Sequence, residues 1–435
     1  MTPPIPPIFE QKLDYYQLAA QQVMRRCDEL ASISSMESGV SRQYLTPEHA
    51  RCNKTVREWM SNIGLSTWQD QAGNICGRYQ SNNPDAKTLL IGSHLDTIPN
   101  AGRYDGILGV LMAVEAVRQL AEKNQSLPFH IDILGFGDEE GTRFGTTLLG
   151  SRAVAGTWEP EWLDALQDQQ GVSLAAALRD FGADPERISL ASRHEDDLLG
   201  YFEVHIEQGP VLEELDQPLG VVSSIAGARR FEVQIKGKAG HAGTVPMDMR
   251  QDALVAAASA IHKIEETAKL FQIVATVGQL QCYPGATNVI PGDCHFTIDI
   301  RSGRDTTRDL AVETIQTQIG ELVENRKMSI EWKEIHRAPA VECASWIQRL
   351  IEKSIQAIEK QPVSIVSGAG HDAMSIAEIT DVGMMFVRCA GGVSHNPLES
   401  VTTEDVADGL RACHHFLLNM SESLRTNPPN QSHDE

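Results

Sequence analysis

The sequence predicts an α/β protein with a covered mixed sheet, into which a smaller ferredoxin-like α+β domain is inserted. Strand-like apolar runs alternate with helical stretches over the first half of the 435 residues. Between residues 216 and 331 the order changes to β-α-β-β-α-β, and the α/β alternation resumes after it. We therefore assign 1–215 and 332–435 to the two parts of the larger domain and 216–331 to the inserted domain.

The larger domain is expected to begin with two helices. Apolar residues recur at helical spacing over residues 10–33. Thr46 followed by Pro47 is typical of an N-cap and a first helical position, so a second helix should run to about residue 63. We expect strands over the apolar runs at 88–94, 129–137 and 201–206. We expect a helix over the longer apolar stretch at 107–122.

The inserted domain and the segment after it follow from the same periodicities. In the inserted domain we expect strands at 230–236, 273–280, 295–301 and 328–334, and helices at 252–266 and 308–325. After it we expect a helix at 344–359, strands at 363–367 and 383–388, and a helix at 403–420. The first residues, TPPIPP, and the last, SHDE, are expected to be loose ends.

Composition excludes several classes of function. The formal net charge is −22, from 37 Lys and Arg against 59 Asp and Glu, which argues against binding nucleic acid or an anionic membrane surface. No apolar run approaches the ~20 residues of a membrane span, and the N-terminus lacks the pattern of a signal peptide. The eight cysteines form no CxxC pair. We therefore expect mostly reduced thiols and a cytoplasmic protein.

Acidic residues and histidines gather where the predicted strands end. His94 and Asp96 are two positions apart, so in an extended segment they share one face. A histidine ligand usually needs a hydrogen-bond partner on its second ring nitrogen, which Asp96 could supply. Asp105 lies in a Gly-flanked turn before a predicted helix, where it is either a helix N-cap or a ligand.

Three consecutive carboxylates, Asp138, Glu139 and Glu140, end another predicted strand. Their mutual repulsion is costly unless a cation neutralises it, although a solvated acidic turn is the simpler alternative. In the functional interpretation, one glutamate binds metal and the other accepts a proton from water.

Two further histidines, His205 and His395, also lie at strand ends in turn sequences. Either one alone would more often be structural, but their recurrence favours a shared site. Five nitrogen and oxygen ligands, one of them bridging, suit two divalent ions, with Zn²⁺, Mn²⁺, Co²⁺ and Ni²⁺ all compatible. The candidate ligands are His94, Asp105, Glu140, His205 and His395.

An ordered set of motifs carries a resemblance to a known family. They are GSHLDT, RYDGILG, DEEGTRF, HIEQGPVLE, AGHAGTVPMDMRQD, ATNVIPG, DIRS, SGAGHDAM and SHNPLE. Together they resemble the M20-type metal-dependent amidases of the hydantoinase/carbamoylase family, over about residues 40–415. The resemblance implies a hydrolase that cleaves the C–N bond of a linear amide. It also implies a homodimer in which the inserted domain serves as lid and dimerisation domain.

The resemblance further implies roles for individual residues. Glu139 would be the general base, Asp105 would bridge the two metals, and Asp96 would lie behind His94. His241 would reach in from the partner subunit and donate to the developing oxyanion. The substrate contacts implied are Gln208, His241, Asn288, Arg301, Gly370 and His371.

The expected substrate is a small ureido carboxylate. An arginine pair such as Arg229 and Arg230 resembles the members that hydrolyse allantoate to ureidoglycine, ammonia and carbon dioxide. Arg229 would then hold an additional polar edge of the substrate; alternatively, both arginines only flank a surface strand. An N-carbamoyl-L-amino acid hydrolase or a β-ureidopropionase is the alternative activity.

Three other classes of function fit the sequence less well. A peptidase is disfavoured by His205, because the related peptidases usually carry an acidic ligand there. Residues 368–373 fit G-x-G-x-x-A of a dinucleotide site, but no acidic residue follows about twenty positions later. A non-catalytic scaffold would not need Glu139 beside Glu140, so the intact pair favours an enzyme.

Overall fold

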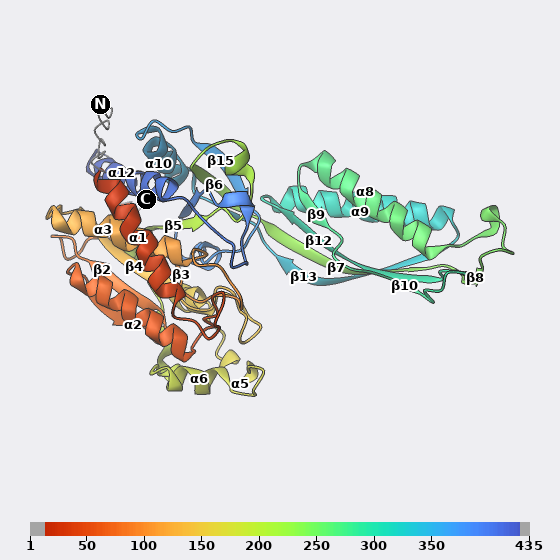
Figure 1. Cartoon of the computed structure of the whole chain (residues 1–435), viewed down its shortest axis with the longest axis horizontal. Coiled ribbons are helices and arrows are strands. Elements are labelled where there is room, and N and C mark those ends of the chain that lie inside the picture. The colour runs from red at the N-terminus through yellow and green to blue at the C-terminus, as the bar shows by residue number, and fades with distance from the viewer. Residues whose placement is uncertain (1–13, 427–435) are drawn as a thin grey trace, which may run out of the picture. The chain divides into compact units, whose positions relative to one another are not determined.

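The computed structural model describes residues 14–426, which form two compact units (Figure 1). The first unit combines the chain up to residue 222 with 343–365 and the segment from 371 onward; the second comprises 223–342 and 366–370. The expectations for TPPIPP, for SHDE and for residues 10–13 of the first helix fall outside the described residues. None of the helices within 14–426 is long and apolar enough to cross a membrane.

The first unit is built on a mixed sheet with the strand order β1-β2-β4-β3-β5-β16-β6. Its central pairs β4–β3, β3–β5 and β5–β16 are parallel, whereas β1–β2, β2–β4 and β16–β6 are antiparallel. The short β14 (Val341–Glu342) and β15 (Val363–Ser367) also pair with β6. The main strands are β1 (Ser66–Gln69), β2 (Ile75–Tyr79), β3 (Thr88–His94), β4 (His130–Phe136), β5 (Leu198–Ile206), β6 (Leu219–Ile225) and β16 (Val382–Val387).

One core lies between this sheet and the longer helices. On β5 the alternate residues Phe202, Val204 and Ile206 belong to that core, and Phe202 stacks on Phe416 with ring centroids 4.1 Å apart. Each large apolar side chain fully buried there stabilises the fold by roughly 1.5–3 kcal/mol. The helices contributing to the core are α1 (Tyr15–Ala31), α2 (Pro47–Asn62), α3 (Ile107–Glu122), α10 (Ser345–Gln356) and α12 (Thr403–Thr426).

The strand alternation leaves Glu203 and His205 of β5 pointing to the other face of the sheet. There they meet α11 (Ala373–Ile376) and the turn before it. A smaller core around Tyr44 and Phe144 covers the neighbouring part of the unit. The short elements of the first unit are α4 (Leu149–Ala155), α5 (Trp162–Ala165), α6 (Leu174–Asp180), η1 (Pro185–Ala191), η2 (Glu195–Asp197), α7 (Val211–Glu214) and η4 (Ala390–Gly392).

The second unit contains a sheet of order β10-β12-β7-β13, with β9 also pairing with β12. Figure 1 shows α8 (Ala253–Phe271) and α9 (Asp305–Asn325) on one face of this sheet, where they enclose a separate apolar core. The segment 273–280, expected to be one strand, is divided around Gly278 between β9 and β10. The strands are β7 (Gly227–Lys236), β8 (Gly240–His241), β9 (Val274–Thr276), β10 (Leu280–Tyr283), β11 (Val289–Ile290), β12 (Asp293–Ser302) and β13 (Ser329–Ala338), with η3 at Met247–Met249.

Candidate metal centre

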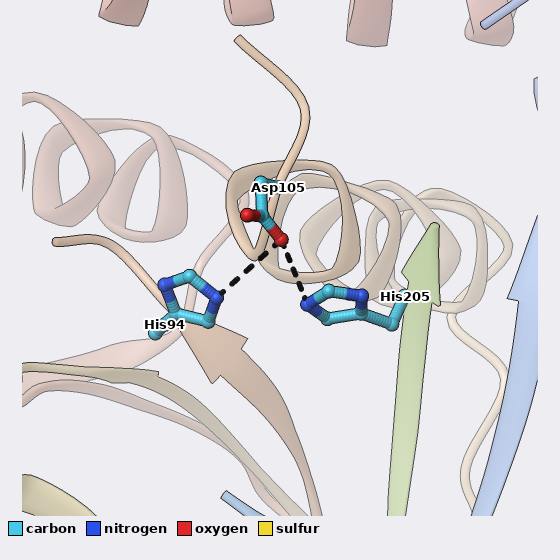
Figure 2. Close-up of side chains that lie close together, drawn as sticks. All are labelled: His94, Asp105 and His205. Carbon is cyan, nitrogen blue, oxygen red and sulfur yellow. Dashed lines mark ion pairs between the residues drawn. The ribbon is translucent and has the colours of Figure 1, made fainter. Parts of the chain in front are cut away.

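Three buried side chains from separate elements meet where β3 and β5 end. His94 is the last residue of β3, His205 lies one residue before the end of β5, and Asp105 precedes Gly106, the N-cap of α3. Nε2 of His205 lies 3.3 Å from Oδ1 of Asp105, and Nε2 of His94 lies 3.9 Å from the same oxygen. Figure 2 shows both imidazoles with a nitrogen turned toward this carboxylate.

Backbone carbonyls fix the tautomer of both imidazoles. Nδ1 of His94 lies 3.0 Å from the carbonyl oxygen of Asp96, and Nδ1 of His205 lies 2.9 Å from that of Ile206. In each ring Nδ1 therefore donates, so that in the neutral form the lone pair is on Nε2, the nitrogen that faces Asp105. Burial also lowers the pKa of His205 to about 4, so that this ring is neutral, as a metal ligand must be.

Gly106 is required for this approach. Its φ is +71°, and a Cβ at this position would lie 2.4 Å from Nε2 of His94. Any other residue would be strained and would displace the His94 ring. This accounts physically for glycine directly after Asp105 in RYDGILG.

Two further predicted ligands complete the cluster on the other side of Asp105. Nε2 of His395 lies 3.2 Å from Oδ2 of Asp105 and 3.6 Å from Oε1 of Glu140. His395 has a left-handed φ of 54°, a conformation that is uncommon for non-glycine residues but is adopted more often by histidine than by most of them. Two groups of potential ligands, His94–Asp105–His205 and Asp105–Glu140–His395, therefore share Asp105, with ligand atoms in each group within 4.8 Å of one another.

The cluster has the properties of a cation site. Nε2 of His205 is buried and makes no hydrogen bond within residues 14–426, although a carboxylate oxygen faces it. Burial raises the pKa of Asp105, but the nearby His395, His205 and His94 outweigh burial and hold it below its usual range. Burial raises the pKa of Glu140 to about 7. A divalent cation would satisfy the orphan nitrogen and neutralise these carboxylates, so the residues fit such an ion.

Asp96 holds the acidic turn rather than the His94 ring. Its carboxylate accepts hydrogen bonds from the backbone amides of Glu139, at 3.1 Å, and Glu140, at 3.3 Å. Its Oδ1 is 3.8 Å from Nδ1 of His94, whereas its backbone oxygen makes the 3.0 Å contact. Burial, reinforced by Glu140, raises the pKa of Glu139 well above its usual value. Glu139 is thus a half-buried carboxylate beside His94, suited to accepting and returning a proton.

Two residues expected to contact substrate make other contacts. Gln208 donates from Nε2 to Oδ1 of Asp105, at 3.1 Å, and to Oγ of Ser394, at 3.0 Å. The ring of His371 is 1% exposed and lies edge-on to the His205 ring, with centroids 4.5 Å apart. Burial lowers the pKa of His371 well below its usual value, so it is neutral. Gly370 precedes it and is exposed.

Sequence reasoning missed Glu399. Its Oε1 accepts hydrogen bonds from the backbone amides of Tyr104, at 2.9 Å, and Asp105, at 3.1 Å, and its Oε2 accepts from Ser394 Oγ at 3.2 Å. Glu399 therefore holds the turn that carries Asp105. The available signal was its place in SHNPLE, four residues after His395.

Glu203 was the second omission. This fully buried carboxylate accepts hydrogen bonds from Ser93 Oγ, at 3.0 Å, and from the backbone amide of Ala373, at 3.1 Å. It ties the end of β3 to the turn that carries His371. The signal was the strand alternation, which places Glu203 on the same face as His205.

In the second unit, His241 and Asn288 are neighbours. His241 on β8 pairs with Val289 on β11, and the amide of Ala242 donates to the Asn288 backbone oxygen at 2.9 Å. Nδ1 of His241 accepts from the amide of Gly243 at 3.1 Å. In the neutral ring the proton is therefore on Nε2, which is free to donate. His241 is exposed.

The arginines of the second unit are placed differently from one another. Arg301 makes two hydrogen bonds to Asp299, at 2.9 and 3.0 Å, and a third to the Gly368 backbone oxygen at 2.8 Å. Arg229 bonds to Glu334 at 2.6 Å and to Asp309 at 3.2 Å. Three N–H groups of Arg229 are thus committed to carboxylates of its own unit, and its contact with substrate stays a prediction.

The chain is similar to known proteins over most of its length. Residues 90–419 match Peptidase family M20/M25/M40. Allantoate deiminase 2 of Glycine max is 38% identical over 437 residues, which cover 93% of this chain and 90% of that protein. The N-carbamoyl-L-amino acid amidohydrolase of Geobacillus stearothermophilus is 38% identical over 407 residues, covering 93% and 99%.

A solved structure extends the similarity to the fold. A hydantoinase/carbamoylase family amidase from Burkholderia multivorans superposes with a TM-score of 0.86 at 29% identity, covering 92% of this chain and 98% of that one. The matched region contains every candidate metal ligand from His94 to His395. The chain therefore belongs to peptidase family M20/M25/M40, a family of metal-dependent enzymes.

Proposed function

We propose that the protein hydrolyses the ureido C–N bond of a small ureido carboxylate, with allantoate as the preferred substrate. The observation that carries this proposal is the pair of ligand groups sharing Asp105, with Glu139 beside them. The relatives named allantoate deiminase and N-carbamoyl-L-amino acid amidohydrolase support the same reaction class. N-carbamoyl-L-amino acids, including the β-ureidopropionase substrate, are the alternative.

The proposed cofactor is a pair of divalent ions, Zn²⁺ or Mn²⁺, with Co²⁺ and Ni²⁺ also compatible with these ligands. Asp105 would be shared by both ions, because one of its oxygens faces His94 and His205 and the other faces His395. Glu140 would complete the side on which His395 lies. Such ions supply Lewis-acid polarisation of a carbonyl group and a lowered pKa of water.

The protein residues then move the protons. Glu139 accepts a proton from the attacking water and returns it to the departing nitrogen, so that the C–N bond breaks without a charged leaving group. Asp96 keeps Glu139 and Glu140 in place through their amides. His241 donates its Nε2 proton to the oxyanion of the tetrahedral intermediate. With allantoate, the products are ureidoglycine, ammonia and carbon dioxide.

The second unit is proposed to act as a lid that binds substrate through His241, Asn288 and Arg301, of which Arg301 would hold the carboxylate. Gln208 and His371 would contribute from the first unit, Gln208 directly and His371 through the His205 ring. Gly370, the last residue of the second unit, would contact substrate beside His371. Closure of a lid would exclude water and complete these contacts. We also propose a homodimer in which His241 serves the partner's site, and a cytoplasmic location.

The proposal is tested by measuring ammonia release from allantoate and from a panel of N-carbamoyl-L-amino acids. We expect a higher kcat/KM for allantoate than for N-carbamoyl-L-leucine and N-carbamoyl-β-alanine. If only the N-carbamoyl compounds are turned over, the proposed reaction class stands and allantoate is not the substrate. Absence of turnover with every ureido compound would refute the proposed function.

A further inference from the structure

Two cysteines of the second unit lie directly opposite each other on neighbouring antiparallel strands. In the register of β10 with β12, Cys282 pairs with Cys294, and both are free thiols in the structure. Cys76, the other cysteine within a strand of residues 14–426, pairs with Trp68 and Leu134 instead. Residues opposite each other in a sheet project their side chains to the same face, so the two thiols are neighbours.

Both thiols belong to the helix-covered face of the sheet. Cys294 is fully buried in the apolar core with Phe296, and the half-buried Cys282 packs against the same core. Because β10 is an edge strand, Cys282 stays partly accessible to solvent, whereas Cys294 does not. The pair therefore combines one accessible thiol with one buried thiol.

The hydrogen bonds of β10 and β12 define the type of this pair. The amide of Thr297 donates to the carbonyl oxygen of Gln279 at 3.2 Å, so these two residues form a hydrogen-bonded pair in the observed register. Hydrogen-bonded and non-hydrogen-bonded pairs alternate along an antiparallel ladder. Cys282 comes three positions after Gln279 and is therefore in a non-hydrogen-bonded pair with Cys294.

The other side of β12 leads to the same conclusion. The amide of Gly237 donates to the carbonyl oxygen of Gly292 at 2.8 Å, so Cys294, two positions later, forms its hydrogen-bonded pair with Ile235 of β7. In a non-hydrogen-bonded pair the Cα atoms are ~4.5 Å apart, within the range of ~4.4–6.8 Å that a disulfide spans. A disulfide between Cys282 and Cys294 therefore needs no rearrangement of the backbone.

The two thiols differ in reactivity. Burial, and then the neighbouring Cys282 thiol, raise the pKa of the Cys294 thiol, so Cys294 is a poor nucleophile toward an oxidant in solution. Cys282 is the accessible member of the pair and is the one that an oxidant reaches first. Once Cys282 is oxidised, the adjacent Cys294 sulfur is the nucleophile in position to react with it.

The pair closes the base of a loop that holds two candidate substrate contacts together. The chain leaves the sheet after Cys282 and returns at Cys294, and the residues between them include Asn288 and β11. Val289 on β11 pairs with His241 on β8, and the Asn288 backbone oxygen accepts the amide of Ala242 at 2.9 Å. A covalent link at the base of this loop therefore acts on the strand pair that supports His241.

We propose that Cys282 and Cys294 are a redox modification site, at which a reversible disulfide fixes the loop 283–293 in its present conformation. With a peroxide as oxidant, the Cys282 thiolate attacks one peroxide oxygen, the O–O bond breaks, and a sulfenic acid and one water form. The Cys294 sulfur then attacks the Cys282 sulfur and the S–O bond breaks. The hydroxyl group leaves with the Cys294 proton as a second water.

The balance of this reaction is complete. The two thiols together lose two electrons and two protons, and the peroxide is reduced to two waters. A dithiol reductant reverses the step by thiol–disulfide exchange. The inference does not depend on the proposed function, because it concerns the sheet and loop of the second unit alone.

The disulfide should act on opening of the loop rather than on its closed form. β10 has four residues and lies at the sheet edge, and its Leu280 and Tyr283 are exposed, so little packing opposes its separation from β12. A cross-link lowers the conformational entropy of the opened state and so makes opening less frequent. Amide hydrogen exchange in 283–293 reports this opening directly.

The test treats the full-length, metal-loaded protein with hydrogen peroxide, blocks the remaining thiols, and maps the peptides by mass spectrometry without reduction. We expect a peptide that links Cys282 to Cys294, in a chain that runs as a monomer on a non-reducing denaturing gel. Dithiothreitol should remove the link. Hydrogen exchange in 283–293 should be at least about tenfold slower in the oxidised protein than in the reduced protein.

Variants separate this pair from the other thiols. Cys282→Ser and Cys294→Ala should each abolish both the linked peptide and the slower exchange on oxidation. Cys343→Ala removes a buried thiol outside the second unit and is the matched control, in which both effects should remain. Thermal unfolding monitored by circular dichroism verifies that each variant folds.

Three results would overturn the inference. The first is oxidation of Cys282 to a sulfinic acid, or its linkage to Cys282 of another chain, with no peptide that joins it to Cys294. The second is a linked peptide with unchanged hydrogen exchange in 283–293, which would refute the restraint of the loop. The third is slower exchange on oxidation of Cys282→Ser, which would assign the effect to another residue.

Discussion

The carboxylate of Glu399 accepts a hydrogen bond from the backbone amide of Asp105, with 3.1 Å between Oε1 and the nitrogen. The two residues are 294 positions apart in the chain, yet this contact orients the carboxylate shared by both candidate ligand groups. The same Oε1 also accepts the amide of Tyr104, so the whole turn before α3 is held from one point. The geometry of the site thus depends on a residue that offers it no ligand atom.

Removing this support should weaken metal binding. Glu399→Ala is expected to lower affinity for Mn²⁺ or Zn²⁺ about 10- to 100-fold, as is usual when a partner behind a ligand is lost. Competition with a chromogenic chelator measures this affinity. Glu399→Gln retains an acceptor for the two amides and should keep most of the wild-type metal affinity. Equal losses in both variants would contradict a role through these hydrogen bonds.

Glu139→Gln should separate catalysis from metal binding. Because Glu139 is assigned as base and not as ligand, we expect bound metal to be unchanged while kcat falls at least about 10²- to 10⁴-fold. Glu140→Gln is the matched comparison, since it changes the adjacent residue and should reduce the metal content as well. Metal content is measured by atomic emission on dialysed protein. Turnover by Glu139→Gln at the wild-type rate would exclude Glu139 as the general base.

Mixing two inactive variants tests whether His241 serves a partner subunit. In a dimer formed from His241→Ala and Glu139→Gln subunits, one site would combine a native Glu139 with a native His241 from the partner. An equimolar mixture that exchanges freely should then recover about one quarter of the wild-type activity. If His241 acts within its own subunit, both sites of the mixed dimer stay inactive and no activity is recovered.

Stability should fall in mild acid because of His414 on α12. Burial, assisted by Lys123 and His415, lowers the pKa of His414 to about 4 from its usual 6.5, and the ring bonds to the Tyr16 hydroxyl at 2.8 Å. Between pH 6.5 and 4 the unfolded chain binds more protons than the folded chain at this residue. The free energy of unfolding therefore decreases as the pH falls from 6.5 to 4.

The His414 contribution is measurable by urea denaturation at pH 7 and pH 4.5. Between pH 7 and pH 4.5 the unfolding free energy of the wild-type protein should fall by about 1–2 kcal/mol more than that of His414→Gln, because glutamine does not titrate. The effect is independent of metal ligation, since His414 contacts none of the candidate ligands. Parallel pH dependences of the two proteins would contradict the predicted pKa.

The positions of the ligands at strand ends could be predicted from sequence, whereas the residues that hold them in place could not. The runs at 88–94 and 107–122 have strong apolar patterns, and the structure forms β3 and α3 over those residues. Local sequence also places His94 and Asp105 at element ends. Glu399 and Glu203 act through contacts that join distant segments, so local sequence marks their positions but does not reveal these contacts.

The arginine pair shows a different limit of sequence reasoning. Residue type and resemblance favoured Arg229, but strand alternation places Arg229 on the core face of β7 and Arg230 on the opposite face. Register is set by the packing of the apolar face beneath α8 and α9. Short strands such as β1 and β2, and the helices α4 to α6, were also missed, because runs of four to seven residues carry little periodic signal.

The central claim is that the cluster around Asp105 is a metal centre that catalyses ureido hydrolysis. The most direct measurement is ammonia release from allantoate by protein stripped with a chelator and then reloaded with Mn²⁺ or Zn²⁺. We expect no turnover by the stripped protein and recovery on reloading, in proportion to bound metal. Undiminished ammonia release by protein without detectable metal would contradict the account.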